Sequence, residues 1–133
     1  LVELDKFKNF KWLGALQYPN EVRKYLSEID MYALISGLDM SPLTLLEAQL
    51  MKKPVIATNV GGISELMVDG KTGFLIEKNN PEKIVEKILE LLEKKEKSNK
   101  FGEEGRKFVE NNFSWNIIAN KFAVDIKKLI DKK

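Results

Sequence analysis

Two carboxylates, Asp39 and Glu47, flank a predicted helix start in the stretch DMSPLTLLE. Ser41 and Pro42 are residue types favoured at the first positions of a helix. The first amide N–H groups of a helix have no partner within it, and the positive end of its dipole favours an anion. The residue types therefore predict a phosphate or pyrophosphate site with carboxylates beside it.

Glu47 follows Leu43 by one helical turn, so it shares a face with an apolar residue that we expect to pack inward. Neither Leu50 nor Met51 can pair with a carboxylate, and sugar hydroxyls are suitable donors to it. Spacing alone leaves open that Glu47 is a surface residue at a helix edge. For Asp39, spacing alone favours a turn or capping role.

A glycosidase acid/base couple is an alternative use of these two carboxylates. Such couples need carboxyl groups roughly 5–10 Å apart across a cleft. Two carboxylates at one helix start could meet that distance. They would also compete with the anion for the same position, so we favour the anion site.

Composition excludes several other chemistries. The 133 residues contain no Cys and no His, which excludes disulfides, thiolate metal sites and every nucleophile that depends on His. The 22 basic and 20 acidic residues leave a net charge of +2, and lysines alternate with glutamates. This mixed-charge surface indicates no nucleic-acid partner.

The first residues and the apolar runs bear on location. The start LVELDK is not a signal peptide, and no apolar run approaches the roughly 18 residues that span a membrane. We therefore expect a cytoplasmic protein. Because the first residue is Leu, we also expect residues upstream that belong to a longer protein.

Apolar runs alternate with helical patterns along the chain. Strands are predicted at residues 9–14, 31–36, 54–58 and 72–77, and helices begin near Pro19, Pro42, Ile63 and Pro81. This alternation predicts an α/β fold, a Rossmann-like parallel sheet with flanking helices. We expect one domain over residues 1–133, with residues 81–133 mainly C-terminal helices. Ligands of such sheets bind beyond the carboxyl ends of the strands.

Finer predictions concern packing. Leu43, Leu46 and Leu50 are expected to form the inward face of their helix. A second C-terminal helix, indicated by Phe101, Arg106, Phe108 and Val109, is expected to be interrupted around Gly102 and Gly105. Trp12 is expected in the core, and Trp115 in core or interdomain packing.

The segment over residues 36–73 resembles the donor-site signature of retaining glycosyltransferases with the GT-B fold. That family includes glycogen, sucrose and lipopolysaccharide sugar transferases. The likeness extends from about Phe10 to Leu129. The matching residues are Ser36, Pro42, Leu43, Leu46, Glu47, Ala48, residues 54–58 (PVIAT), Gly61, Gly62, Glu65, Asp69, Gly70, residues 72–75 (TGFL) and residues 113–115 (FSW).

The resemblance implies a nucleotide-diphosphate-sugar site, with UDP-, ADP- or GDP-sugar as donor and no metal or other cofactor. Glu47 would accept hydrogen bonds from the ribose hydroxyls, and Asp39 would contact the donor sugar. We take Asp39 and Glu47 as the candidate catalytic residues. The other substrate-binding candidates are Met40, Ser41, Leu43 and Thr44, with Leu16 near the base; Gly61, Gly62 and Glu65 would shape the loop beside the cleft.

Three residues depart from the family pattern. Asp39 replaces Glu and is about one methylene shorter. Met40 replaces Gly and, because Met resists a positive φ, we expect the loop conformation to be affected. Lys52 replaces the Gly expected after the helix, so we expect a different C-terminal cap.

The resemblance covers only part of a complete enzyme. The four predicted strands resemble the last four of six in the order 3-2-1-4-5-6, so the strand at 9–14 would lie apart from that at 31–36. The acceptor, a sugar or lipid-linked sugar, would bind the missing domain. Membrane association would occur only through such an acceptor, and nothing in the sequence supports it.

Two functions remain open at this point. The parent protein is expected to be a glycosyltransferase of the hexosyltransferase type, with the isolated chain inactive. Alternatively, the chain is a non-catalytic binding module or one half of a two-chain transferase.

Overall fold

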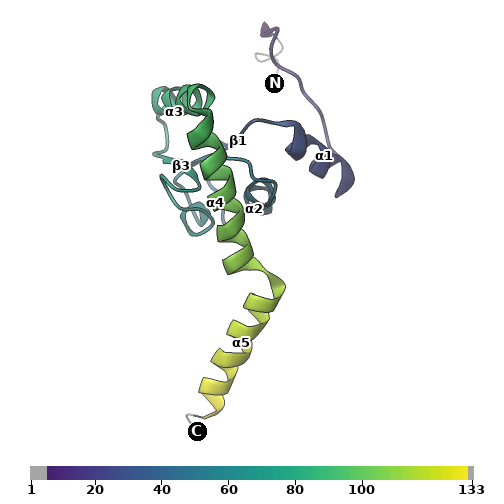
Figure 1. The fold of residues 1–133 in the computed structure, drawn as a ribbon, viewed down its shortest axis with the longest axis vertical. Helices are drawn as coiled ribbons and strands as arrows, with labels where there is room; N and C mark the ends of the chain where they lie inside the picture. The colour runs from purple at the N-terminus through teal and green to yellow at the C-terminus, as the bar shows by residue number, and fades with distance from the viewer. Residues whose placement is uncertain (1–5, 132–133) are drawn as a thin grey trace.

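The computed structural model describes residues 6–131, so both ends of the domain expected over 1–133 lie outside the described residues. Its centre is a parallel sheet with the strand order β1-β2-β3, surrounded by helices (Figure 1). The middle strand is buried at every position, as its continuous apolar run predicts. The strands are β1 (Tyr32–Leu34), β2 (Val55–Thr58) and β3 (Gly73–Ile76).

Helices connect the strands and follow the last one. This order confirms the α/β, Rossmann-like class, because parallel neighbours need crossover connections. The helices are α1 (Asn20–Glu28), α2 (Leu43–Leu50), the 3-10 helix η2 (Ile63–Glu65), α3 (Pro81–Glu93), α4 (Lys95–Phe113) and α5 (Trp115–Ile130).

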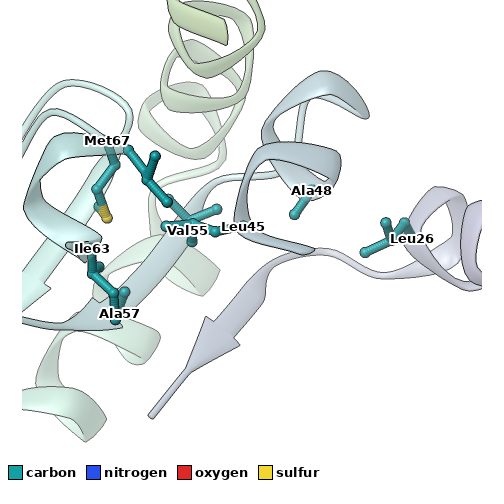
Figure 2. Packing of buried hydrophobic residues seen from close by; sticks show 8 residues of the cluster. Leu26, Leu45, Ala48, Val55, Ala57, Ile63 and Met67 are labelled. Carbon is teal, nitrogen blue, oxygen red and sulfur yellow. The ribbon is translucent and has the colours of Figure 1, made fainter. Parts of the chain in front are cut away.

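Successive residues of β2 belong to two different hydrophobic clusters. Val55 and Ala57 lie in one cluster with residues of α1 and α2, whereas Ile56 lies in the other with residues of β3, α3 and α4. Alternate side chains of a strand point to opposite faces, so the two clusters cover the two faces of the sheet. Figure 2 shows the first cluster extending from Met67 through α2 to Leu26 on α1.

The buried face of α2 differs from the predicted one. Leu45, Ala48 and Gln49 are fully buried, whereas Leu43 is 68% exposed and Leu50 39%. The prediction of an inward Leu43–Leu46–Leu50 face is wrong. The helix LTLLEAQL has apolar residues on nearly every side, so periodicity alone does not select the buried face.

The predicted strand at residues 9–14 is absent from the described fold. These residues form no strand, and Trp12, expected in the core, is 65% exposed. A strand needs a neighbour for its backbone hydrogen bonds, and the three described strands pair only with one another. Figure 1 shows the chain before α1 running apart from the sheet until it reaches α1.

The predicted break at Gly102 and Gly105 is also wrong, because α4 runs through both. A Cβ on Gly102 would lie 2.0 Å from the backbone oxygen of Lys52, and one on Gly105 would lie 3.2 Å from Cγ of Gln49. These glycines therefore let α4 approach α2 closely instead of ending the helix.

The end of α2 also differs from expectation. Lys52 adopts φ +57°, and the amides of Lys52 and Lys53 donate to the oxygens of Gln49 and Ala48 at 2.9 and 3.0 Å. This is the usual left-handed helix cap, with Lys in the glycine position. The expectation of a different cap is wrong.

The last helix, α5, buries no side chain against the described residues, and Trp115 is 86% exposed. Figure 1 shows α5 extending away from the sheet beyond the end of α4. Trp115 is therefore not part of the described core.

Candidate functional site

The carboxyl ends of the three strands are held together by short polar contacts. The Ser36 amide donates to Thr58 Oγ1 at 3.0 Å, and the Thr58 hydroxyl donates to the Ser36 oxygen at 2.7 Å. The Asn59 amide donates to the Ile76 oxygen at 2.8 Å. These bonds place the loops after β1, β2 and β3 at one edge, where ligands of such sheets bind.

The loop that carries Asp39 rests on two glycines. Cβ atoms on Gly61 and Gly62 would lie 2.0 Å from the Asp39 oxygen and 2.1 Å from the Met40 oxygen, respectively. Gly61 also has φ +54°, which disfavours any side chain. Met40 has no positive φ, so Met in place of Gly does not strain the loop. Asp39 is half-buried and Met40 is exposed.

The start of α2 leaves amides available at this edge. Pro42 occupies the N-cap position with φ −72° and ψ 102°, and no side chain caps the helix, so the expected Ser41 cap is wrong. The first amide bonded within the helix is that of Leu45, which donates to the Pro42 oxygen at 3.0 Å. Within the described residues, the amides of Leu43 and Thr44 donate no hydrogen bond. This is the arrangement that binds an anion.

Thr44 is linked to the sheet. The Tyr32 phenol donates to Thr44 Oγ1 at 2.7 Å, which ties β1 to the first turn of α2. Since the Thr44 oxygen accepts this proton, its own hydroxyl proton remains able to donate to a ligand.

Glu47 is half-buried and lines a cavity of about 460 Å³ between α1, α2 and α4. Its carboxylate has no hydrogen bond or ion pair within residues 6–131. The other residues that line the cavity are Tyr18, Pro19, Val22, Arg23, Leu26, Leu50, Met51 and Arg106. A partly buried carboxylate beside apolar walls suits a ligand that carries hydroxyl donors.

The remaining predicted residues take less central positions. Leu16 is half-buried and does not line the cavity, and Glu65 is exposed at the end of η2. The structure therefore brings together Asp39, Gly61, Gly62 and the start of α2. Glu47 lies one helical turn farther along α2, facing the cavity.

Sequence reasoning missed Lys78. Its Nζ lies 3.9 Å from the position of a Cβ on Gly37, at the end of β1. The signal was present, because Lys78 follows the last predicted strand and the carboxyl ends of parallel strands share one edge. Tyr18, Arg23 and Arg106 were also missed, since only the packing of the helices brings them beside Glu47.

The largest resolved pKa change lies away from this edge. Hydrogen bonds from Lys87 at 2.7 Å and Lys97 at 2.7 Å lower the pKa of Glu90 from about 4.5 to about 2. Both lysines also lie over the Phe74 ring, at 4.6 and 4.8 Å from its centroid. This network joins α3, α4 and β3 and belongs to the scaffold.

Metal ligands and membrane spans can be assessed for the described residues. Residues 6–131 contain no group of three or more carboxylates that could hold a metal ion. No described helix is both long and apolar enough to span a bilayer. The cytoplasmic location stays a prediction.

The sequence is similar to those of proteins described as glycosyltransferases. It is 34% identical over 128 residues to an uncharacterized glycosyltransferase of Methanocaldococcus jannaschii, covering 96% of this chain and 35% of that protein. It is 33% identical over 126 residues to a GDP-mannose-dependent phosphatidylinositol monomannoside mannosyltransferase of Corynebacterium glutamicum, covering 90% of this chain and 32% of that protein. The chain thus spans about a third of the length of these relatives.

Solved structures share the fold. The Anabaena protein HepE, solved with UDP and glucose, superposes with a TM-score of 0.83 at 22% identity, covering 96% of this chain and 34% of HepE. The C-terminal domain of the Francisella tularensis group 1 protein LpcC gives a TM-score of 0.71 at 26% identity, covering 77% of this chain and 53% of that domain.

A family model matches most of the chain. The model of the glycosyl transferases group 1 family covers residues 3–108, which include the sheet, the start of α2 and the loop of Gly61 and Gly62. The chain has the GT-B type of C-terminal domain and belongs to the glycosyl transferases group 1 family.

Proposed function

We propose that this chain is the donor-binding part of a retaining glycosyltransferase, which transfers a hexose from a nucleoside diphosphate to a hydroxyl acceptor. Family membership supports this proposal. So do the relative described as GDP-mannose-dependent and the similar structure solved with UDP and glucose. The donor would be a UDP-, ADP- or GDP-sugar.

The observation that carries the proposal is the pair of available amides at the start of α2, beside the loop of Asp39. The amides of Leu43 and Thr44 would bind the diphosphate, and the ammonium group of Lys78 would reduce its charge. These groups would stabilise the departing nucleoside diphosphate electrostatically. Asp39 would accept hydrogen bonds from hydroxyls of the donor sugar.

Glu47 would bind the ribose. Its carboxylate faces a cavity, and no described side chain pairs with it. The ribose offers two adjacent hydroxyl donors, and hydrogen bonds to a charged group are worth about 1.5–3 kcal/mol. The acceptor, a sugar or lipid-linked sugar, would bind another part of the parent enzyme.

A second candidate is a binding module without catalysis, or one half of a two-chain transferase. The chain spans 35% of the first relative and 32% of the second. By the resemblance described above, Asp39 also replaces a Glu of the donor-site signature. On either view we propose that the isolated chain has no transferase activity.

Calorimetric titration of the chain with UDP, GDP and ADP tests the proposed site. At least one of them should bind, and Glu47→Gln should weaken that binding by about 10- to 100-fold, the factor that corresponds to the lost charged hydrogen bonds. Glu93→Gln is the matched control, because Glu93 is exposed on α3 and lines no described cavity. Absence of binding by all three nucleotides would contradict the proposal. Retention is tested separately, by the anomeric configuration of the product that the parent enzyme forms.

A further inference from the structure

We propose that Tyr18 stacks on the base of the donor nucleotide and that Arg23 selects it, favouring uracil or guanine over adenine. This inference rests on the proposed function, because it assumes that Glu47 binds the ribose. It adds a class of base, defined by a carbonyl edge, and two residues that recognise it.

The cavity beside Glu47 has the size and lining of a small-molecule site. Its volume of about 460 Å³ falls within the roughly 300–1,000 Å³ of such sites. Val22 and Leu26 of α1 face it from one side, and Leu50 and Met51 of α2 from the other. An apolar slot of this kind accepts a flat heterocycle.

The position of Glu47 connects the slot to the start of α2. Ribose lies between the phosphates and the base in every nucleotide. With the phosphates on the amides of Leu43 and Thr44 and the ribose on Glu47, the base continues into the cavity that Glu47 lines. Leu16 does not line this cavity, whereas Tyr18 does. The geometry therefore assigns the base contact to Tyr18.

Tyr18 offers a stacking surface. Its side chain is 74% exposed at the rim of the cavity. Stacking of a base on an aromatic ring is worth about 1–3 kcal/mol and depends little on which base is stacked. Tyr18 would therefore strengthen binding of every nucleotide without choosing among them.

Arg23 would discriminate between the bases. Among the described ion pairs, Arg106 binds Glu110 at 2.7 Å, whereas Arg23 has no partner. Of the two arginines that line the cavity, Arg23 is therefore the one whose side chain is available to a ligand. A guanidinium group only donates hydrogen bonds. The guanine edge presents O6 and N7 as acceptors, and uracil presents carbonyl oxygens, whereas adenine presents an amino donor beside N7.

The test compares the Kd values of UDP, GDP and ADP for the chain. UDP or GDP should bind the original chain at least about tenfold more tightly than ADP, since a hydrogen bond from the charged guanidinium group to a carbonyl oxygen, which adenine lacks, is worth about 1.5–3 kcal/mol. Which of the two binds better identifies the base. Arg23→Gln should bring the three Kd values to within about threefold of one another. Lys24→Gln, the adjacent charge on α1 that does not line the cavity, should leave the ratios unchanged.

A second pair of variants tests stacking. Tyr18→Ala should weaken binding of all three nucleotides by about tenfold or more, and Tyr18→Phe should restore it, because the ring alone stacks. Trp12→Ala is the control, since Trp12 is an exposed aromatic residue outside the cavity. Circular dichroism confirms that each variant is folded.

The outcomes separate this inference from the proposed function. Nucleotide binding that depends on Glu47 but shows equal affinities, tighter ADP or no response to Arg23→Gln would overturn the inference alone. Failure of the original chain to bind any of the three nucleotides would overturn both.

Discussion

The amide of Gly62 donates a 3.0 Å hydrogen bond to the backbone oxygen of Asp39, which joins the loop after β2 to the loop after β1. The two loops can approach this closely because Gly62 has no side chain, since a Cβ there would lie 2.1 Å from the Met40 oxygen. Two loops far apart in the sequence thus position the Asp39 carboxylate through backbone contacts. Because only its backbone contacts the glycines, the loop of Asp39 and Met40 keeps its side chains available to a ligand.

Replacing Gly62 by Ala should displace the loop of Asp39 and Met40. The added Cβ meets backbone and not a flexible side chain, so we expect a loss of about 1–3 kcal/mol in the free energy of unfolding. Nucleoside diphosphate binding should weaken as well. Gly37→Ala is the control, because the nearest atom to its Cβ is Lys78 Nζ at 3.9 Å. Urea denaturation and calorimetric titration measure the two effects, and equal stability of the two variants would contradict this account of the loop.

Replacing Gly102 by Ala should destabilise the protein although Ala is the better helix former. Helix propensity favours Ala by about 1 kcal/mol. The new Cβ, however, would lie 2.0 Å from the Lys52 oxygen, and relieving this clash requires α4 to move from α2. We expect a net loss of about 1–3 kcal/mol in the free energy of unfolding, measured in urea.

Gly105→Ala is the comparison for Gly102, since it adds the same atom to the same helix. Its Cβ would lie 3.2 Å from the Gln49 Cγ, a side-chain atom that can shift. Its cost should therefore be smaller than that of Gly102→Ala. A Gly102→Ala variant more stable than the original protein would show that α4 is not held against Lys52 as described.

Glu90 should make stability depend on acid pH. Hydrogen bonds from Lys87 and then Lys97 lower its folded-state pKa from about 4.5 to about 2. A lowered carboxyl pKa means that the stabilisation is fully present above pH 4.5 and is lost as pH falls toward 2. The difference in unfolding free energy between the original protein and Glu90→Gln should be constant from pH 7 to pH 5 and shrink below pH 4.5.

The same titration with Glu93→Gln provides the control. Glu93 is exposed and takes part in none of the described ion pairs, so its removal should not change the acid dependence. A Glu90→Gln difference that stays constant down to pH 2.5 would show that the ion pairs with Lys87 and Lys97 do not form in solution.

The sequence alone determined the order of elements and the family. The runs PVIAT and TGFLIE became β2 and β3 within one residue at each end, because a buried parallel strand requires a continuous apolar segment. The resemblance was equally direct, since most of the matched residues lie close together between Ser36 and Leu75. The helix start beside Asp39 followed from the same segment, although Pro42 and not Ser41 occupies the N-cap position.

Only the tertiary structure decided which residues meet. Leu43 is exposed and Leu45 buried because α2 is apolar on most sides, and contact with the sheet and α4 selects its inner face. From the sequence, Gly102 and Gly105 of α4 were predicted to break the helix. In the fold they allow α4 to pack closely against Lys52 and Gln49. Nothing in the sequence indicates that Tyr18, Arg23 and Glu47 lie close together. Only the packing of α1 beside α2 places them around one cavity.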